Sequence, residues 1–384
     1  MTNNKDKKVL NVPNLRFPEF TGEWMKCKFG EIATGFDYGM NAAAKPYDGQ
    51  NKYIRITDID EASSTYNNSS IVSPDGILSE NYVVNEGDIL LARTGASTGK
   101  SYLYRKSDGK LYYAGFLIRA NVAEHNPYFV FSQLHTHRYW RWVSIMSARS
   151  GQPGINSLEY ASFPIFTTTL KEENKISSLL SLIDERIATQ NKIIEDLKKL
   201  KSAIRKRVFT SFKNGHTESC EINQLIAYEQ PTAYIVTNDE YSADKTLTPV
   251  LTANKGFVLG YTDEDFGIYQ KGECIIFDDF TMDAKYVSFP FKVKSSAIKI
   301  LTAKPDVNLR FMFEYLSYLE LKSEEHKRHY ISEIASLVIE LPSKEKQNRI
   351  AYLMTSLDNK LALEENTRAR YMDEKRYLLS QMFI

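Results

Sequence analysis

The segment GASTGKS (95–101) contains the residue types that could hold a phosphate group, and it comes after a run typical of a β-strand. A Walker A motif has four residues between its first glycine and GK, whereas this segment has three and no helical pattern comes after it. We therefore do not expect nucleotide binding. Cations and backbone N–H groups here could instead meet a nucleic-acid phosphate. A solvated, flexible loop is the alternative.

Two other groups of residues imitate catalytic motifs. Pro305-Asp306 with Glu320-Leu321-Lys322 is similar to the PD…ExK pattern of metal-dependent nucleases, which place these residues on strands. Here the residues between them have a helical pattern, so we expect Asp306 to cap a helix. Asn126-Pro127-Tyr128 resembles part of the catalytic tetrapeptide of amino-methyltransferases but lacks its second proline, and we expect a helix start.

The histidines show no metal-binding pattern. Neither the His135/His137 pair nor the His326/His329 pair has a third ligand at metal spacing. Cys27, like the other two cysteines, is far from any second cysteine. No nucleophile, base and acid form a set. We therefore expect a chain with no catalytic centre, no bound metal and no cofactor of its own.

Among the elements that would position these candidate residues, the longest is a predicted helix that occurs twice in the chain. Within the stretch from Glu172 to Phe209 the same register returns without a gap 174 residues later, where Gln347 corresponds to Glu173 and Phe383 to Phe209. Asp184 and Lys201 are matched identically after the shift. A gapless register over this length indicates an internal duplication.

Apolar residues recur in both copies at alternating steps of three and four, which predicts a stripe along one side of a helix. In the first copy these are Ile176, Leu180, Ile183, Ile187, Ile194, Leu197, Ile204 and Val208. In the second copy the corresponding residues are Ile350, Met354, Leu357, Leu361, Arg368, Tyr371, Leu378 and Met382. Each helix would be about 55 Å long. It needs an equally long partner, and the other copy is the candidate.

Composition fits a globular chain of two or three domains: 384 residues, 42% hydrophobic and 25% charged. Because no run of 18 apolar residues and no basic-then-apolar leader occur, we expect neither a membrane span nor a secretion signal. Three scattered cysteines suit a reducing cytoplasm. We therefore expect a cytoplasmic protein.

The net charge is only +1, and it is unevenly distributed. Residues 214–340 carry 20 acidic and 12 basic side chains, whereas residues 171–213 carry 6 and 11. A strongly basic surface is the usual mark of a protein that binds nucleic acid by itself. This balance argues against tight, autonomous DNA binding.

Two β-rich regions precede the two long helices. In the first, alternation and turn residues predict strands at 52–60, 81–84, 88–92, 100–105 and 110–122. A helical pattern over 127–148 comes next. The second region repeats this order in outline: 248–256 corresponds to 52–60, 271–287 to 86–104, and 307–330 to 127–148.

These pieces together resemble the DNA-recognition (specificity) subunits of Type I restriction–modification systems. The resembling segments are VPNLRFPEFTGEW (12–24), GDILLARTGASTGKS (87–101), GQPGINSLEY (151–160), ENKISSLLSLIDERI (173–187) and QNRIAYLMTSLDNKL (347–361). The likeness spans nearly the whole chain, and its strength lies in the order of the segments.

The resemblance implies an α+β fold: two mixed β-rich target-recognition domains joined by two long helices that form an antiparallel coiled-coil spacer, related by a pseudo-twofold duplication. The expected ranges are 1–165 for the first domain, 166–213 for the central helix, 214–341 for the second domain and 342–384 for the distal helix. The residues expected to pack the spacer are Ile176, Leu180, Ile183, Ile187, Leu197, Ile204, Ile350, Leu357, Leu361 and Leu378.

In function, the resemblance implies a non-catalytic subunit whose domains each read one half of a bipartite, gapped DNA site. The spacer would set the distance between the half-sites. The implied partners are double-stranded DNA, two modification methyltransferase subunits and restriction/translocase subunits. S-adenosylmethionine, ATP and Mg²⁺ are expected on those partners, which would carry out adenine methylation and restriction.

Residue chemistry indicates the DNA contacts, because Arg pairs naturally with guanine and Gln with adenine. In the first domain the candidates are Arg55, Thr57, Arg93, Thr94, Thr98, Lys100, Arg149, Ser150 and Gln152. In the second domain they are Thr252, Asn254, Lys255, Asp279, Thr281 and Lys285, with Lys327 and Arg328 as phosphate contacts.

Two alternatives stay open at this point. One is a scaffold protein whose helices associate and whose domains bind other proteins, which would suit the acidic second domain. The other is a divergent metal-dependent nuclease that uses Asp306.

Overall fold

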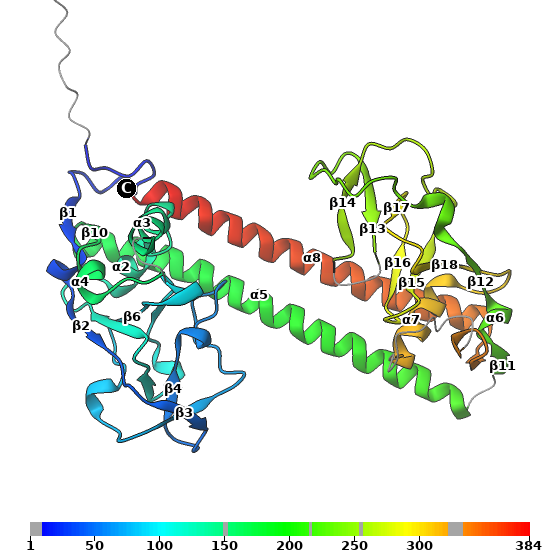
Figure 1. The fold of residues 1–384 in the computed structure, drawn as a ribbon, viewed down its shortest axis with the longest axis horizontal. Helices are drawn as coiled ribbons and strands as arrows, with labels where there is room; N and C mark the ends of the chain where they lie inside the picture. The colour runs from blue at the N-terminus through cyan, green and yellow to red at the C-terminus, as the bar shows by residue number, and fades with distance from the viewer. Residues whose placement is uncertain (1–9, 149–152, 215–216, 253–255, 322–332) are drawn as a thin grey trace, which may run out of the picture. The chain divides into compact units, whose positions relative to one another are not determined.

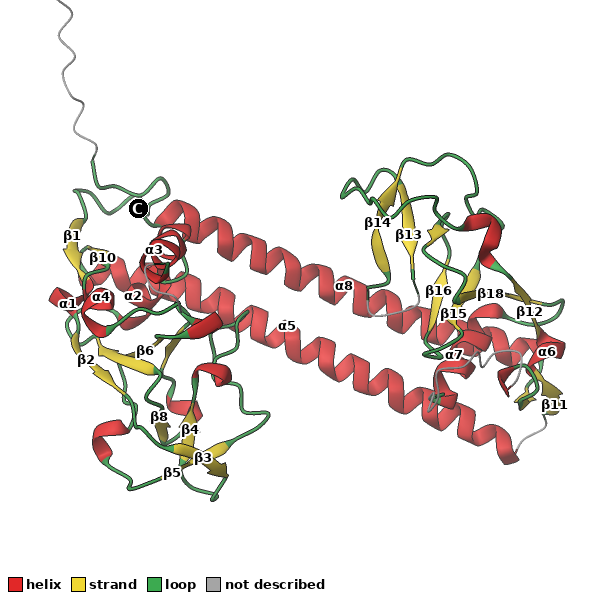
Figure 2. Cartoon of the chain, in the orientation of Figure 1, coloured by secondary structure: helices red, strands yellow, loops and turns green. Residues whose placement is uncertain are grey.

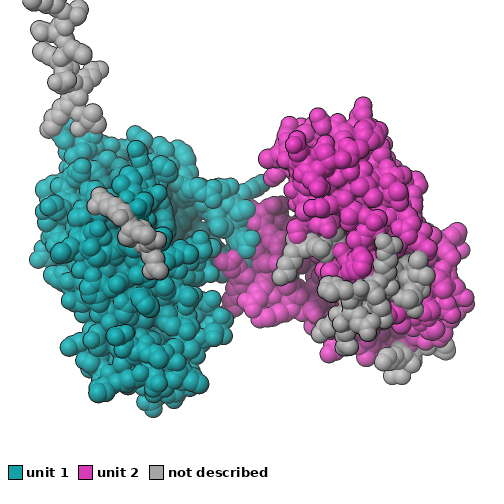
Figure 3. Space-filling model, in the orientation of Figure 1, with its two compact units in different colours: residues 1–190, 367–384 teal, residues 191–366 magenta. Residues whose placement is uncertain are grey.

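The chain divides into two compact units, coloured separately in Figure 3. A computed structural model describes residues 10–148, 153–214, 217–252, 256–321 and 333–384. The first unit combines Met1–Gln190 with Thr367–Ile384, and the second is Asn191–Asn366. Each unit therefore contains the beginning of one long helix and the end of the other.

The first unit is built on a four-stranded antiparallel sheet (Figure 1). Its strands lie in the order β2 (Thr34–Tyr38), β9 (Leu117–Asn121), β6 (Asp88–Ala92) and β7 (Ser101–Leu103). Every residue of β6, DILLA, is buried, as expected for a mainly apolar strand at the centre of a sheet. The sheet thus holds β6 between two neighbouring strands, and the chain leaves the sheet after Ala92.

Smaller sheets and short helices complete this unit (Figure 2). β4 (Lys52–Ile54) pairs in parallel with β8 (Leu111–Tyr113), and the antiparallel pairs are β3 (Ala43–Pro46) with β5 (Val72–Asp75) and β1 (Met25–Lys28) with β10 (Pro164–Thr167). The short helices are α1 (Phe29–Ile32), α2 (Pro127–Gln133), α3 (His137–Ser147) and α4 (Ser157–Ala161).

The second unit repeats this topology with different residues. Its main sheet has the equivalent order β12 (Ile226–Glu229), β18 (Ile298–Ala303), β15 (Cys274–Asp278) and β16 (Ala284–Val287). The parallel pair recurs as β13 (Thr248–Leu251) with β17 (Lys292–Val293), and β14 (Val258–Thr262) joins β13. β11 (Glu218–Glu221) pairs with β19 (Val338–Leu341), and the helices are α6 (Ile222–Leu225) and α7 (Leu309–Leu319).

The duplicated helices are α5 (Leu170–Thr210) and α8 (Lys344–Met382). All residues of the predicted apolar stripe are buried or half-buried, whereas Leu182, Leu200 and Leu363 on the other faces are exposed. In the first unit the start of α5 packs with the end of α8, and in the second unit the end of α5 packs with the start of α8. The helices are therefore antiparallel.

Ion pairs repeat this arrangement in both units. Lys375 donates to Asp184 at 2.6 Å in the first unit, and Lys201 donates to Asp358 at 2.5 Å in the second. The 174-residue shift converts one pair into the other, with the two helices exchanged. Residues that recur in the sequence thus become partners across the two helices.

Each long helix is also tied to a capping asparagine of its unit. The side chain of Asn126 accepts from the first turn of α2 and donates to Asn174 at 2.7 Å. The side chain of Asn308 accepts from Phe311 N–H at the start of α7 and donates to Asn348 at 2.9 Å. Asn174 and Asn348 are again 174 residues apart. The duplication therefore preserves the attachment of domain to helix.

The cores of the two units use matching stripe positions. In the first unit Ile176 and Leu180 of α5 share a core with Met382 and Phe383. In the second unit Ile350 and Met354 share a core with Phe209, and Val208 packs against it. The predicted α+β class with an antiparallel helix pair and an internal duplication is confirmed by this architecture.

Several local predictions differ from the structure. Residues 80–82 form a 3-10 turn rather than a strand, because the Ser79 hydroxyl caps the Asn81 N–H. The helix expected over 127–148 is two helices, since Thr136 caps a new start at α3. The cap of α7 is Asn308 and not Asp306, which adopts a left-handed backbone (φ 64°) before it. None of the described helices is long and apolar enough to cross a membrane.

A buried charge network distinguishes the second unit. Glu314 of α7 has no exposed surface, and it accepts from Arg205 at 2.9 Å and from Arg310 at 2.7 Å. Lys201 lies 3.4 Å away, and both Lys201 and Arg310 also contact Asp358. Three cations thus converge on two carboxylates between α5, α7 and α8.

The buried stripe can be tested with a matched pair of leucines on α5. Leu180 is fully buried, whereas Leu182 is 56% exposed. We expect Leu180→Ala to lower the free energy of unfolding by about 2–5 kcal/mol, because it leaves a cavity in the core. Leu182→Ala should stay within about 0.5 kcal/mol of the wild type. Equal effects of the two variants in urea unfolding would contradict the packing described.

The charge network gives a second prediction. Glu314→Gln should lower the free energy of unfolding by roughly 3–5 kcal/mol, because it leaves buried cations with less compensation. Glu345→Gln, at an exposed ion pair with Arg349 on α8, should change little. Thermal unfolding of both variants checks this, and a Glu314→Gln variant as stable as the wild type would show that the network is not stabilising.

Candidate nucleic-acid interface

Two segments far apart in the sequence meet at the end of strand β6. Thr94 forms a β-bridge with Gly154, the Gly95 N–H donates to the Pro153 carbonyl at 3.0 Å, and the Ile155 N–H donates to the Arg93 carbonyl at 2.9 Å. Residues 93–95 and 153–155 therefore form one local structure.

Two buried tyrosines hold the 93–100 loop in place. The Tyr160 hydroxyl donates to the Ala92 carbonyl at 2.7 Å and accepts from the Gly99 N–H at 3.2 Å, and the Tyr139 hydroxyl donates to the Gly99 carbonyl at 2.8 Å. Gly99 has a φ of +93°, and a Cβ there would lie 2.8 Å from a methyl group of Val143. Glycine is therefore required, and the loop is rigidly supported at both ends.

The predicted contact residues of this loop fall into two groups. Arg93, Thr94 and Lys100 are half-buried at the surface. Thr98 is buried, and its hydroxyl donates to the Gly95 carbonyl at 2.8 Å. The prediction for Thr98 is therefore corrected: its side chain closes the turn and has no free path to DNA.

Arg93 rests on an aromatic side chain that the sequence did not single out. Its guanidinium lies 4.7 Å from the centre of the Tyr38 ring, at the end of β2. Tyr38 is 41% exposed, and its hydroxyl accepts from the Ser157 N–H at 3.3 Å. This hydrogen bond and the nearby Arg93 charge lower the pKa of Tyr38. Only the tertiary fold brings residues 38, 93 and 157 together.

Two other predicted cations of the first unit, Arg55 and Lys100, are engaged with carboxylates. Arg55 donates twice to Asp58, each time at 2.8 Å, and Lys100 lies 3.3 Å from Glu61. Thr57 is exposed beside the Arg55 pair. Arg55 would have to give up Asp58 to reach DNA, so it is a weaker candidate than Arg93.

His135 is not placed to contact phosphate. Its Nδ1 lies 2.9 Å from the Phe131 carbonyl and its Nε2 lies 2.9 Å from the Ser64 hydroxyl. Burial and the nearby Lys375 charge lower the pKa of His135 to about 4. The ring is therefore neutral near pH 7 and serves to hold the 60–65 loop.

In the second unit, Thr281 is exposed, while Thr252 and Lys285 are half-buried. Asp279 is 1% exposed and lies 3.6 Å from the ammonium group of Lys299, which is also buried. The prediction that Asp279 contacts DNA is therefore corrected, since its carboxylate is enclosed. Asp278, the residue before it, is buried and accepts from the Phe280 and Thr281 N–H groups.

Seven of the predicted contact residues lie outside the described residues. They are Arg149, Ser150, Gln152, Asn254, Lys255, Lys327 and Arg328. For them, DNA contact stays a prediction.

Asp306 and Glu320, the two acidic residues that imitate a nuclease motif, do not assemble, and Lys322 of that pattern lies outside the described residues. Asp306 precedes α7 and Glu320 comes after it, so the 11 residues of the helix separate them by about 16 Å. Within the described ranges, no three His, Cys, Asp or Glu side chains are grouped to hold a metal ion. After Lys100 the chain enters strand β7 and not a helix, so the phosphate-loop lookalike also lacks its required context.

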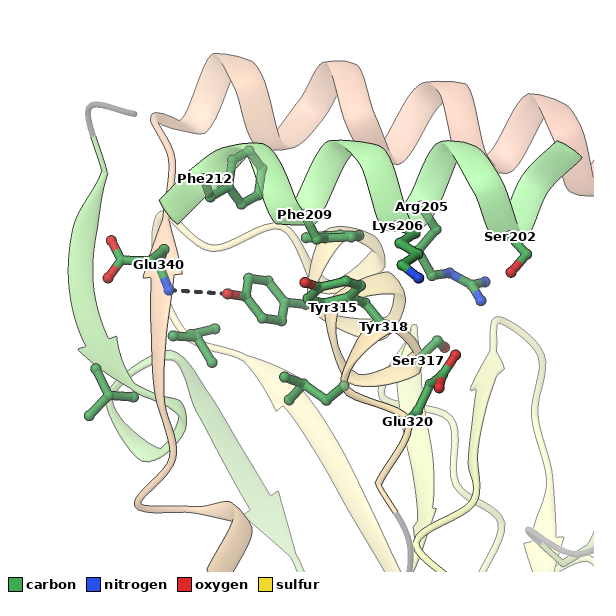
Figure 4. A pocket seen from close by; sticks show the side chains of 13 residues that line it. Ser202, Arg205, Lys206, Phe209, Phe212, Tyr315, Ser317, Tyr318, Glu320 and Glu340 are labelled. Carbon is green, nitrogen blue, oxygen red and sulfur yellow. Dashed lines mark hydrogen bonds between the residues drawn. The ribbon is translucent and has the colours of Figure 1, made fainter. Parts of the chain in front are cut away.

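The second unit contains a pocket of about 620 Å³ between α5, α7 and β19 (Figure 4). Phe209 packs against Tyr315 and Tyr318 on its wall, and the Glu340 N–H donates to the Tyr315 hydroxyl at 3.2 Å. Arg205 on its rim is already bound to Glu314. The pocket presents an aromatic wall and no grouping of acid, base and nucleophile.

Comparisons with known proteins agree with this architecture. The family model of the Type I restriction modification DNA specificity domain matches residues 218–370. The specificity subunit of the Escherichia coli type I restriction enzyme EcoR124I/EcoR124II is 39% identical over 165 residues. That match covers 39% of this chain and 41% of the relative, so less than half of its length. A putative specificity subunit, MjaX, from Methanocaldococcus jannaschii is 23% identical over 77% of each chain.

Solved structures show the same fold over nearly the full length. The S subunit of a Type I restriction–modification system from M. genitalium has a TM-score of 0.67 at 15% identity, covering 97% of this chain and 99% of that one. A chain from a structure of type I system assembly and conformational transition has a TM-score of 0.52 at 14% identity, covering 94% of this chain and 97% of that one. By family match, curated relatives and fold, the chain is similar to the specificity subunits of Type I restriction–modification systems.

Proposed function

We propose that this chain recognises DNA for a Type I restriction–modification complex, with each β-rich unit reading one half of a bipartite, gapped site. The observation that carries the proposal is the duplication itself. Two units share a sheet order and a helix attachment, but they differ in the residues at the end of the central strand. A shared scaffold with different surface loops suits the recognition of two different half-sites.

The chain acts in this proposal as a subunit without catalysis of its own. Methyltransferase subunits would bind S-adenosylmethionine and methylate adenine, and restriction/translocase subunits would use ATP and Mg²⁺, in the cytoplasm. This division is in keeping with the near-neutral net charge. Partner subunits can supply phosphate contacts, which provide affinity, while this chain supplies base contacts, which provide specificity.

The two alternatives receive less support. Asp306 and Glu320 stand at opposite ends of α7, which disfavours a nuclease site at these residues. A scaffold role, in which the helices associate and the domains bind other proteins, does not account for the match of residues 218–370 to a DNA specificity domain.

The decisive experiment is methylation mapping by sequencing in cells that express this chain with its methyltransferase partner. We expect one new adenine-methylated motif with two defined halves separated by a fixed gap. The physical reason is that two recognition units in one chain read one site together.

The control is the same methyltransferase with a different specificity subunit, which must produce its own motif. If that control methylates DNA while this chain yields no new motif, the scaffold alternative is favoured. A continuous, ungapped motif would contradict the assignment of one half-site to each unit.

A further inference from the structure

Among the described residues of the first unit, Arg93 differs from Arg55, Lys100 and Arg119 in having no ion pair with a carboxylate. Arg55 is bound to Asp58, Lys100 to Glu61, and Arg119 to Asp37 at 3.4 Å. No carboxylate of the described residues lies within ion-pair distance of Arg93. A half-buried guanidinium without a carboxylate retains its charge and its donors for a ligand.

The position of Arg93 is fixed from both sides. Its N–H donates to the Phe116 carbonyl at 3.0 Å and its carbonyl accepts from Ile155 N–H, while its guanidinium carbon lies over the Tyr38 ring, 4.7 Å from the ring centre. A cation–π contact at this distance does not occupy a hydrogen-bond acceptor, so the guanidinium can still donate to a ligand. Phe116 is 58% exposed beside it, so this surface is uncovered and partly aromatic.

The second unit has the opposite charge at the same topological position. Strand β6 ends at Ala92 and strand β15 ends at Asp278, and the next residues are Arg93 and Asp279. The N–H groups of both donate to the carbonyl just before the neighbouring strand, at 3.0 Å and 2.9 Å. Asp279, however, is buried with Lys299. The two units therefore cannot make the same contact here.

We propose that Arg93, positioned by its cation–π contact with Tyr38, is a DNA-contacting residue of the first unit with no counterpart in the second. Its ligand is a pair of acceptor atoms in the first half-site, which Arg binds in a bidentate manner. The acceptors are either O6 and N7 of a guanine or two phosphate oxygens. Tyr38 is a positioning residue. This inference rests on the proposed function.

The experiment compares Arg93→Ala, Arg93→Lys, Tyr38→Ala and Tyr38→Phe in the full chain with its methyltransferase partner. The methylated motif and the DNA affinity at several salt concentrations are measured together. Arg93→Ala should weaken binding roughly tenfold to a hundredfold. Tyr38→Ala should change binding in the same direction but less, and Tyr38→Phe should resemble the wild type because it keeps the ring.

The two sources of acceptors give different results. A guanine contact predicts that Arg93→Ala and Arg93→Lys both relax the motif at one G·C pair of one half-site, since lysine lacks the planar fork. A phosphate contact predicts an unchanged motif, a salt slope reduced by about one for Arg93→Ala, and partial recovery in Arg93→Lys. Either result supports the contact.

Arg119→Ala is the matched control, because Arg119 also lies over a tyrosine, Tyr113 at 5.3 Å, but is paired with Asp37. It should leave motif and salt slope unchanged. If the wild type produces a motif while Arg93→Ala changes neither motif, affinity nor salt slope, the inference fails and the proposed function stands. A Tyr38→Ala variant that binds like the wild type would overturn the positioning role. A wild type without a motif would instead count against the proposed function.

Discussion

The structure depends on the pairing of the beginning of one long helix with the end of the other. Apolar stripe residues of both helices enter the cores of the two units, and the pairs Lys375 with Asp184 and Lys201 with Asp358 link the helices in matching positions. A helix of about 40 residues with an apolar stripe cannot remain exposed, and its own unit covers only part of that stripe. In each unit, the antiparallel partner helix helps to cover the apolar stripe, and it does so with equivalent residues.

This constraint explains why the first unit is completed by residues 367–384, from the far end of the chain. Met382 and Phe383 enter the core that Trp24 and Phe129 build, with Phe383 at 5.3 Å from Phe129 between ring centres. The end of α5 does the same for the second unit through Phe209. Each unit thus depends on a segment that belongs, in sequence order, to the other repeat.

The preserved scaffold contrasts with the residues that it carries. Asn126 and Asn308 attach short helices to the long ones in the same way, and the central strands β6 and β15 occupy the same place in their sheets. Yet the residue after the central strand is a surface arginine in one unit and a buried aspartate in the other. The buried central strands and these hydrogen bonds maintain the framework, so the loops are free to diverge, as expected where function resides in loops on a rigid support.

The sequence by itself determined the elements whose physics is local or periodic. The stripe from Ile176 to Val208, the 174-residue repeat, the helix start at Asn126 and the buried strand at 88–92 could all be predicted, because apolar spacing and caps are readable along the chain.

Which polar residues are accessible, in contrast, depends on the tertiary structure. In the sequence, Thr98 and Asp279 are candidates for DNA contact at the surface. In the structure both are buried: the Thr98 hydroxyl donates to the Gly95 carbonyl, and the Asp279 carboxylate lies beside Lys299. Tyr38 carries no local signal, and it gains its place beside Arg93 because β2 and β6 belong to one sheet. Accessibility and partnership are properties of contacts between distant residues, and only the fold creates those contacts.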